Sequence, residues 1–393
     1  MSAHVERAGA PSELQLLFLR AALVEGPEAA SAWEQVKHRT RNADVLDHAS
    51  YRTLPQLYRN LAGLGVEDAD MQRMKGIYRH AWCTNQRLFH DAARVLRALE
   101  TAGIETMLLK GAAVSGLCYG SAGARPMADF DVLVHEADAP RAAAVLEEGG
   151  WCRLRSDASG EPSDEPLERT MRRTHSAGFR HSDGRECDLH WSPLYEPIPE
   201  AAFWKTAMPI VFGGVATNVP DPTHQLLHTC VHGLGWSAAP VTWIEDAVMI
   251  VRTAPGGIDW ERVAEDAERW GLTGRVEPAL RRLRDLFDID VPPAVIARMA
   301  HARRTPSERL AERALAARGV RARPHVMFWA RYRRLKRIGS PIADDGLTAY
   351  LRDSFGVPTR RAVLPHITRK AVGLVLRRAG ARATPSGSAS CSA

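Results

Sequence analysis

The hydrophobic pattern of the chain changes near Ile104, and this change most constrains the fold. Before it, apolar residues recur at three- and four-residue spacing, which predicts amphipathic helices. One such stripe comprises Leu88, Ala92, Val95, Leu96 and Leu99. After Ile104, short apolar runs end at glycine-rich turns, a pattern typical of β-strands, and helical spacing returns after residue 193. We therefore expect an α+β protein with a small mixed sheet, flanked by N-terminal and C-terminal helical regions.

The run DFDVLV at residues 129–134 predicts a strand that carries two carboxylates on one face. Side chains at i and i+2 of a strand point the same way, so Asp129 and Asp131 project together while Phe130 faces the core. Two carboxylates this close repel each other unless a cation compensates them. Mg²⁺, or Mn²⁺ in its place, prefers carboxylate oxygens and would bind here directly.

A third carboxylate is expected from a second acidic strand at residues 186–191. The dipeptide Asp183-Gly184 predicts a hairpin that leads into this strand. Alternation places Asp188 on one face with Glu186 and His190. If the strand lies beside residues 129–134, Asp188 completes a three-carboxylate cluster that can hold two metal ions ~4 Å apart.

A phosphate-binding turn is expected upstream of these strands. At Lys110-Gly111 the chain leaves an apolar run and enters a short helical segment. Free backbone N–H groups and the positive end of a helix dipole meet at such a turn, where they bind phosphate. Lys110 and Arg125 would add positive charge, and the Arg125 guanidinium suits bidentate contact with phosphate oxygens.

These segments carry a family resemblance. LLKGAAVSGLCYG, ARPMADFDVLV and ECDLHW resemble the DNA polymerase beta-like nucleotidyltransferase superfamily, and more closely a bacterial group of uncharacterised nucleotidyltransferases. The motifs cover about residues 104–192, with weaker similarity in the flanking helices. The resemblance implies that Gly111 lies at the phosphate turn and that Asp129 and Asp131 bind both metals. It also implies that Asp188 binds the metal that activates the nucleophile.

The implied reaction moves a nucleoside monophosphate from a nucleoside triphosphate, expected to be ATP, to an acceptor hydroxyl, with release of pyrophosphate. One position departs from the family pattern, because the serine that usually follows the glycine is Ala112. Lys110 and Ser115 are the candidates to replace its contact with the phosphates. The acceptor stays open among a small molecule, a peptide or protein, and RNA. The rival interpretation is a protein that binds a nucleotide or a partner on this core without turning it over.

Two further groups of residues allow more than one interpretation. His224, His228 and His232 recur at four-residue spacing, which fits either a zinc site or a helix face beside a cleft. The glutamate of an HExxH motif is absent and no fourth ligand is evident, so we favour structural histidines. Glu245 and Asp246 either contact the acceptor or form an ordinary acidic start to a helix.

Positive charge is concentrated near the C-terminus. The net charge is +6, but residues 318–382 carry 16 Lys or Arg and three Asp, so they hold +13 and the remainder holds −7. This basic arm is a candidate contact for nucleic acid or an acidic partner. Because it also contains Phe328, Trp329 and Leu335, we favour partial packing of the arm on the core.

The expected organisation follows from these patterns. The regions are an N-terminal helical region at 1–102, a nucleotidyltransferase core at 103–192, a C-terminal helical domain at 193–317, a partly helical basic arm at 318–382 and a disordered tail at 383–393. Six cysteines are spread singly along the chain, so we expect reduced thiols. With no apolar run near ~20 residues and no signal-peptide pattern, we expect no membrane span and a cytoplasmic protein.

Overall fold

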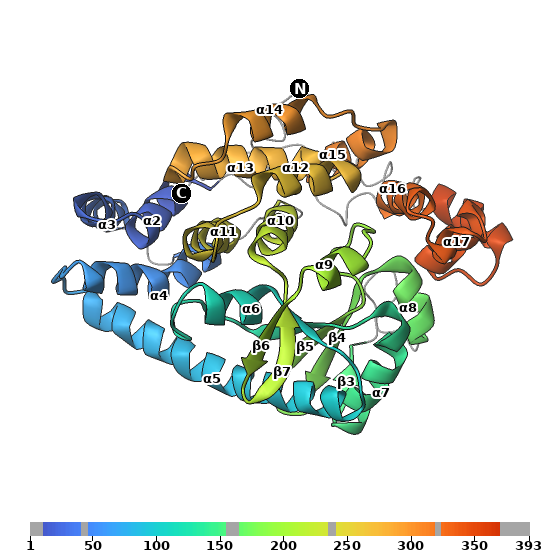
Figure 1. The fold of residues 1–393 in the computed structure, drawn as a ribbon, viewed down its shortest axis with the longest axis horizontal. Helices are drawn as coiled ribbons and strands as arrows, with labels where there is room; N and C mark the ends of the chain where they lie inside the picture. Colours follow the sequence, from blue (N-terminus) through green and yellow to red (C-terminus); the bar gives the residue numbers. More distant parts are fainter. Residues whose placement is uncertain (1–10, 41–45, 155–164, 235–240, 319–323, 370–393) are drawn as a thin grey trace, which may run out of the picture.

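A seven-stranded mixed sheet with helices on both faces forms the centre of the molecule (Figure 1). The computed structural model describes residues 11–40, 46–154, 165–234, 241–318 and 324–369. The expected tail at 383–393 lies outside the described residues. The strand order is β3-β4-β5-β2-β1-β7-β6, and both parallel and antiparallel pairs occur. The expected α+β class with a mixed sheet is confirmed.

The strands follow the alternating and apolar runs of the sequence. They are β1 (Met107–Leu109), β2 (Asp129–Leu133), β3 (Trp151–Arg153), β4 (Ser176–His181), β5 (Glu186–His190), β6 (Met208–Phe212) and β7 (Val215–Val219). The hairpin expected at Asp183-Gly184 is present as the antiparallel pair β4–β5. β6 and β7 form a second antiparallel hairpin, and β7 joins the sheet beside β1, so the sheet extends beyond the expected core at 103–192.

Four described helices precede β1, in the region where the sequence predicts helices. They are α2 (Glu13–Leu23), α3 (Pro27–Thr40), α4 (His48–Gly63) and α5 (Met71–Thr101). Ser12 caps α2 by accepting from the Gln15 N–H, and Asp47 caps α4 in the same way. α5 lies along one face of the sheet with α7 (Ala139–Glu148), whereas α6 (Lys110–Leu117) lies on the other face (Figure 1).

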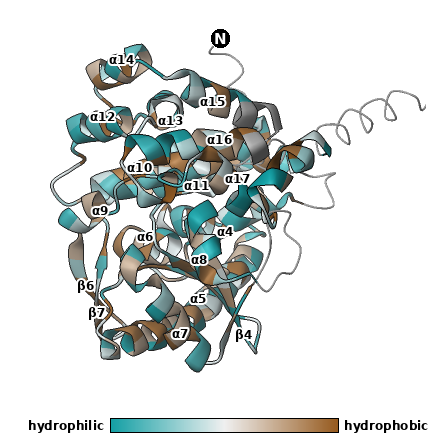
Figure 2. Ribbon diagram, turned by 90° about the vertical axis from the view of Figure 1, so that its right-hand side faces the viewer, coloured by the Kyte–Doolittle hydropathy of each residue, from teal (hydrophilic) through white to brown (hydrophobic). Residues whose placement is uncertain are grey.

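Two helices interrupt the strands in the sequence: α8 (Leu167–Arg173) between β3 and β4, and α9 (Ala201–Lys205) between β5 and β6. The helices that follow β7 are α10 (Pro222–Gly233), α11 (Thr242–Thr253), α12 (Trp260–Arg269), α13 (Thr273–Phe287), α14 (Pro293–His301), α15 (Pro306–Arg318), α16 (Pro324–Arg337) and α17 (Leu347–Phe355). α10 and α11 lie between α6 and the outer helices α12, α13 and α14 (Figure 2). Among the described residues, no helix is both long enough and apolar enough to cross a membrane.

Two hydrophobic clusters hold these layers together. One fills the space between the sheet and α5 and α7, with Phe130, Val132 and Leu189 at its centre. The other joins α2, α3 and α4 to α10 through α14, with Leu57 and Ile244 fully buried. The two helical regions on either side of the sheet in the sequence therefore share one hydrophobic core. Five cysteines (Cys83, Cys118, Cys152, Cys187 and Cys230) are free thiols, as expected.

The described part of the basic arm packs against the rest of the protein. Phe328 and Leu335 are buried in a cluster shared by α16 and α17. Arg331 on α16 donates to the backbone carbonyls of Tyr195 and Thr174, and its guanidinium lies 5.0 Å from the centre of the Tyr195 ring. These contacts support the expected partial packing of the arm. Residues 370–382 of the arm lie outside the described part of the chain.

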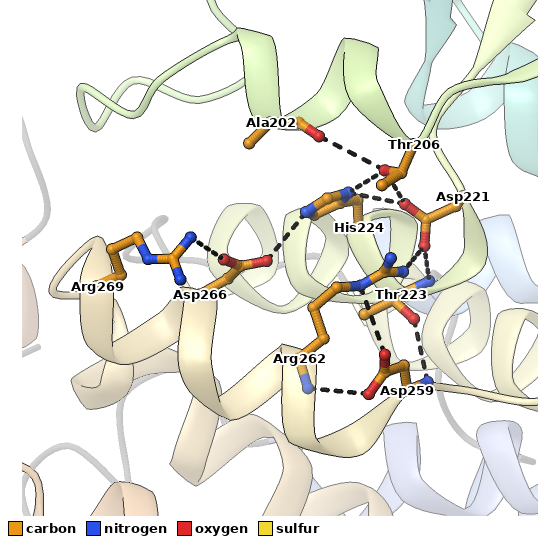
Figure 3. Close-up of polar contacts among 9 residues, drawn as sticks. All are labelled: Ala202, Thr206, Asp221, Thr223, His224, Asp259, Arg262, Asp266 and Arg269. Carbon is orange, nitrogen blue, oxygen red and sulfur yellow. Dashed lines mark hydrogen bonds and ion pairs between the residues drawn. The ribbon is translucent and has the colours of Figure 1, made fainter.

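The buried side chain of His224 on α10 makes polar contacts with neighbouring segments (Figure 3). Nδ1 of His224 lies 2.7 Å from Oδ2 of Asp221, and Nε2 lies 3.2 Å from Oδ2 of Asp266 on α12. Thr206 lies 2.9 Å from the same Nδ1. Burial alone would lower the pKa of His224, but the two carboxylates outweigh it and raise that pKa above its usual range. Carboxylates beside both ring nitrogens therefore favour the protonated form of His224 in the folded protein.

We predict a pH-dependent cost for His224→Gln. A histidine whose folded pKa is raised contributes stability that is fully present below its unfolded pKa of about 6.5, and lost as the pH rises through the folded pKa. Urea unfolding should show a loss of about 3 kcal/mol at pH 6 and a clearly smaller loss at pH 9. The exposed His301 provides the control, because His301→Gln should change stability little at either pH. Equal losses for His224→Gln at both pH values would contradict this account.

We also predict that Arg331→Ala destabilises the whole fold. The variant removes two hydrogen bonds from a charged donor to partly buried backbone carbonyls, a loss of roughly 2–4 kcal/mol. Arg333, two residues further along α16, is exposed and provides the matched control. Thermal melts should show a lower midpoint for Arg331→Ala and an unchanged midpoint for Arg333→Ala. Two identical midpoints would mean that α16 does not stabilise the core.

Candidate functional site

The pairing of β2 with β5 brings the predicted carboxylates together. The two strands are parallel, with Asp131 opposite Asp188 and Asp129 opposite Glu186. Phe130 points into the opposite core and is fully buried, as the alternation predicts. The strand neighbourhood assumed from the sequence is therefore confirmed, and Asp129, Asp131 and Asp188 share one face of the sheet.

His190 also belongs to this group. Alternation in the sequence predicts that His190 shares a face with Asp188, but it predicts no role for His190 in the site. Ligand atoms of Asp131, Asp188 and His190 all lie within 4.8 Å of one another. In the part of the chain that the structure describes, this is the one group of three or more such side chains that could hold a metal ion. Nε2 of His190 lies 3.0 Å from Oδ1 of Asp131. Asp129 lines the same cavity at the edge of this group.

Lys110 neutralises one of the three carboxylates. Its Nζ lies 2.5 Å from Oδ1 of Asp131. Burial acts to raise the pKa of Asp131, but the Lys110 ammonium and His190 outweigh it and hold that pKa far below its usual range. Burial and the neighbouring Asp131 charge raise the pKa of both Asp129 and Asp188. The cluster therefore has one well-compensated carboxylate and two that would gain from a further cation.

A cavity of about 350 Å³ lies above the cluster. Its sheet side is lined by Lys110, Gly111, Met127 and the three aspartates. Its helix side is lined by Arg52 of α4, His228, Thr229 and His232 of α10, and Thr242, Trp243 and Asp246 of α11. Arg125 completes the lining. Residues from before, within and after the expected core thus build one site.

The expected turn at Lys110-Gly111 borders this cavity, where α6 begins. Lys110 has a φ of 46°, in the left-handed region that residues with a side chain rarely adopt. At Gly111 an added Cβ would clash with Nη1 of Arg125 and would lie 2.7 Å from Sδ of Met127, so a side chain here would displace Arg125 or Met127. Ala112 and Ser115 are buried in α6 and do not line the cavity.

Arg125 is held in place by Asp246. Its Nε and Nη2 donate to the two carboxylate oxygens of Asp246 at 2.7 and 2.8 Å, and the Tyr119 hydroxyl donates to Oδ1 at 2.8 Å. Burial opposes the charged form of Arg125, but Asp246 outweighs it and raises the pKa of the guanidinium. Asp246 thus lines the cavity and orients Arg125, whereas Glu245 is buried and its pKa is raised well above normal, mainly by that burial.

The three spaced histidines of α10 do not converge on one point. His224 faces Asp221 and Asp266, as described above, while Nε2 of His228 donates to the Pro193 carbonyl at 2.9 Å. Burial and the nearby Lys110 charge lower the pKa of His228 to about 3, so this ring is neutral. No group of potential metal ligands among the described residues includes these histidines, which favours the structural interpretation.

Comparisons with known proteins place this site in context. No curated protein matches the chain, whereas six chains of solved structures do. One of them is an antigenic nucleotidyltransferase-like protein from Paracoccidioides brasiliensis. It is 14% identical, the match covers 56% of this chain and 94% of that chain, and the TM-score is 0.34.

The family comparison is more extensive. A family model described as uncharacterised nucleotidyltransferase matches residues 44–288. The matched region includes α4, the whole sheet, α10 and α11, and therefore every residue that lines the cavity. Since this is more than half of the chain, the protein belongs to the family of uncharacterised nucleotidyltransferases.

Proposed function

We propose that the protein transfers a nucleoside monophosphate from a nucleoside triphosphate to an acceptor hydroxyl. The acceptor oxygen forms a bond to the α-phosphorus, the bond from that phosphorus to the bridging oxygen breaks, and pyrophosphate leaves. The observation that carries the proposal is the direct pairing of Asp131 with Asp188, beside Asp129, at the floor of a cavity that also contains the Lys110-Gly111 turn.

The donor set fits a hard divalent cation. Asp129, Asp131 and Asp188 offer carboxylate oxygens, the ligands that Mg²⁺ and Mn²⁺ prefer. In the proposal these three residues hold the metal, and His190 orients the Asp131 carboxylate. When bound, the metal would neutralise phosphate charge and favour the ionised form of the acceptor hydroxyl.

The residues at and beside the Lys110-Gly111 turn would contact the phosphates. In the proposal Gly111 lets the backbone approach the phosphates, and Lys110 and Arg125 supply charge. Ala112 and Ser115 are buried away from the cavity surface, so we assign them no direct contact. ATP is the expected triphosphate. The acceptor would enter between the sheet and the wall formed by α10 and α11.

A binding protein without turnover is the rival, and one observation favours it. The Lys110 ammonium already occupies a cation position on Asp131, as in a site that no longer needs a metal. Nevertheless, no basic side chain among the described residues forms an ion pair with Asp129 or Asp188, and both carboxylates have raised pKa values. Residues that repel each other in this way are typical of a functional site.

Asp129→Asn should abolish transfer without harming the fold. Asp129 is exposed to the cavity and repelled by its neighbours, so its loss should leave the thermal midpoint unchanged or slightly raised. Pyrophosphate release with each of the four nucleoside triphosphates, Mg²⁺ and cell extract should fall roughly a hundredfold or more. The exposed Glu148 gives the control variant Glu148→Gln. Near-wild-type release by Asp129→Asn would refute the metal assignment.

Asp131→Asn is expected to behave differently, because Asp131 is buried and paired with Lys110. Removing one partner of a buried ion pair leaves an uncompensated charge. This variant should lose activity and also unfold at a lower temperature, so it cannot test catalysis alone.

Incubation of the wild-type protein with labelled nucleotide and cell extract would identify the acceptor.

Lys110→Met should raise the affinity for Mn²⁺ in the absence of nucleotide. The Lys110 ammonium and a metal ion compete for the same carboxylate, so its removal should strengthen Mn²⁺ binding roughly tenfold, a change of about 1.4 kcal/mol. Electron paramagnetic resonance of free Mn²⁺ measures this directly. The exposed Lys205 provides the control Lys205→Met. Unchanged or weaker Mn²⁺ binding in Lys110→Met would show that the ammonium does not stand in the metal position.

A further inference from the structure

α4 brings a third basic side chain into the cavity. Arg52 lines it together with Lys110 and Arg125, and its Nη2 donates to the Pro126 carbonyl at 2.9 Å. Pro126 follows Arg125 in the segment that leads into β2. α4 belongs to the N-terminal helices, outside the core expected from the sequence, so the contribution of Arg52 becomes apparent only in the folded protein.

Arg52 differs from the other two cations in its partners. Lys110 is paired with Asp131, and Arg125 is paired with Asp246. Among the described residues, no carboxylate lies within ion-pair distance of Arg52. Its Nε is buried and has no hydrogen-bond partner. The cavity therefore contains one guanidinium that no described carboxylate pairs with directly, although Asp246, Asp129 and Glu245 are near enough to favour its charge, and its donors are incompletely used.

Such an arrangement is unfavourable unless a ligand completes it. Burial, and then the positive charge of Arg125, lower the pKa of Arg52, yet arginine stays charged in proteins. A partly buried charge without a counter-ion costs free energy that an anionic ligand would recover. The planar guanidinium fork matches the geometry of two phosphate oxygens, which makes a phosphate group the fitting anion.

Arg125 indicates where that phosphate would lie. Its Nε and Nη2 are taken by Asp246, but its Nη1 points to the Gly111 turn, where it would meet any added Cβ. Arg52 and Arg125 are near enough for their charges to repel. Two guanidinium groups beside a phosphate-binding turn thus face the same part of the cavity.

We propose that Arg52 binds a phosphate of the nucleoside triphosphate, together with Nη1 of Arg125, beside the Gly111 turn. The inference rests on the proposed function, because it names a residue that holds the donor substrate. A phosphate carried by the acceptor would offer the same chemistry, and the experiment below separates the two sources.

The test compares Arg52→Gln, Arg52→Lys and Arg59→Gln by calorimetric titration of inorganic tripolyphosphate and of ATP, each with Mg²⁺. Glutamine at position 52 keeps an amide that can donate to the Pro126 carbonyl but removes the charge. Arg59 is the matched control, since it lies on the same helix and donates to the Tyr119 carbonyl but does not line the cavity. Thermal melts of all three variants show whether each protein is folded.

Arg52→Gln should lower the affinity for both tripolyphosphate and ATP roughly ten- to hundredfold. Arg52→Lys should weaken the binding of both probes only severalfold, and Arg59→Gln should leave it unchanged. If Arg52→Gln does not fold, the Arg52→Lys titration decides, because a bidentate contact should still be weakened severalfold by lysine.

Three outcomes would overturn the proposal. Unchanged affinity in Arg52→Gln would mean that Arg52 only donates a hydrogen bond to the Pro126 carbonyl and binds no phosphate. Weaker binding of tripolyphosphate with unchanged binding of ATP would mean that Arg52 binds a phosphate of the acceptor instead. If the wild-type protein binds neither probe, the proposed phosphate site does not exist. Neither titration requires turnover, so Arg52-dependent binding without pyrophosphate release would contradict nucleotidyl transfer and leave the Arg52 assignment standing.

Discussion

The repulsion among three carboxylates on one sheet face is the constraint around which the rest of the site is built. Parallel pairing of β2 with β5 places Asp131 directly opposite Asp188, and Asp129 lies two residues before Asp131. Lys110 and His190 compensate Asp131. The raised pKa values of Asp129 and Asp188 indicate that the same face would gain from further positive charge.

The helical layers supply the walls that make these carboxylates a site. α4 and α11 belong to one hydrophobic cluster and reach the cavity with Arg52 and Asp246. Because the cluster is tightly buried, both side chains start from fixed backbone positions. Asp246 then orients Arg125 from across the cavity. The basic side chains of the cavity are thus positioned by helices, and its carboxylates at positions 129, 131 and 188 by strands.

Much of this arrangement could be predicted from local sequence patterns. Alternation at residues 129–134 and 186–191 was enough to place the carboxylates, because side-chain direction in a strand depends only on spacing. The position of Arg52 could not be predicted, since α4 meets the cavity through contacts between distant segments. The Arg125–Asp246 pair and the burial of Ser115 depend on the same long-range packing, which propensity and periodicity do not encode.

The hydrophobic core that α2, α3 and α4 share with α10 to α14 also has a consequence for biosynthesis. α2 and α4 bury apolar residues against α11, which the ribosome makes only after the entire sheet. Until then the early helices expose that surface, and long-range contacts of this kind form slowly. Arg52 accordingly reaches its final environment only when α11 docks. A nascent chain therefore holds its aspartate strands well before it can assemble a complete pocket.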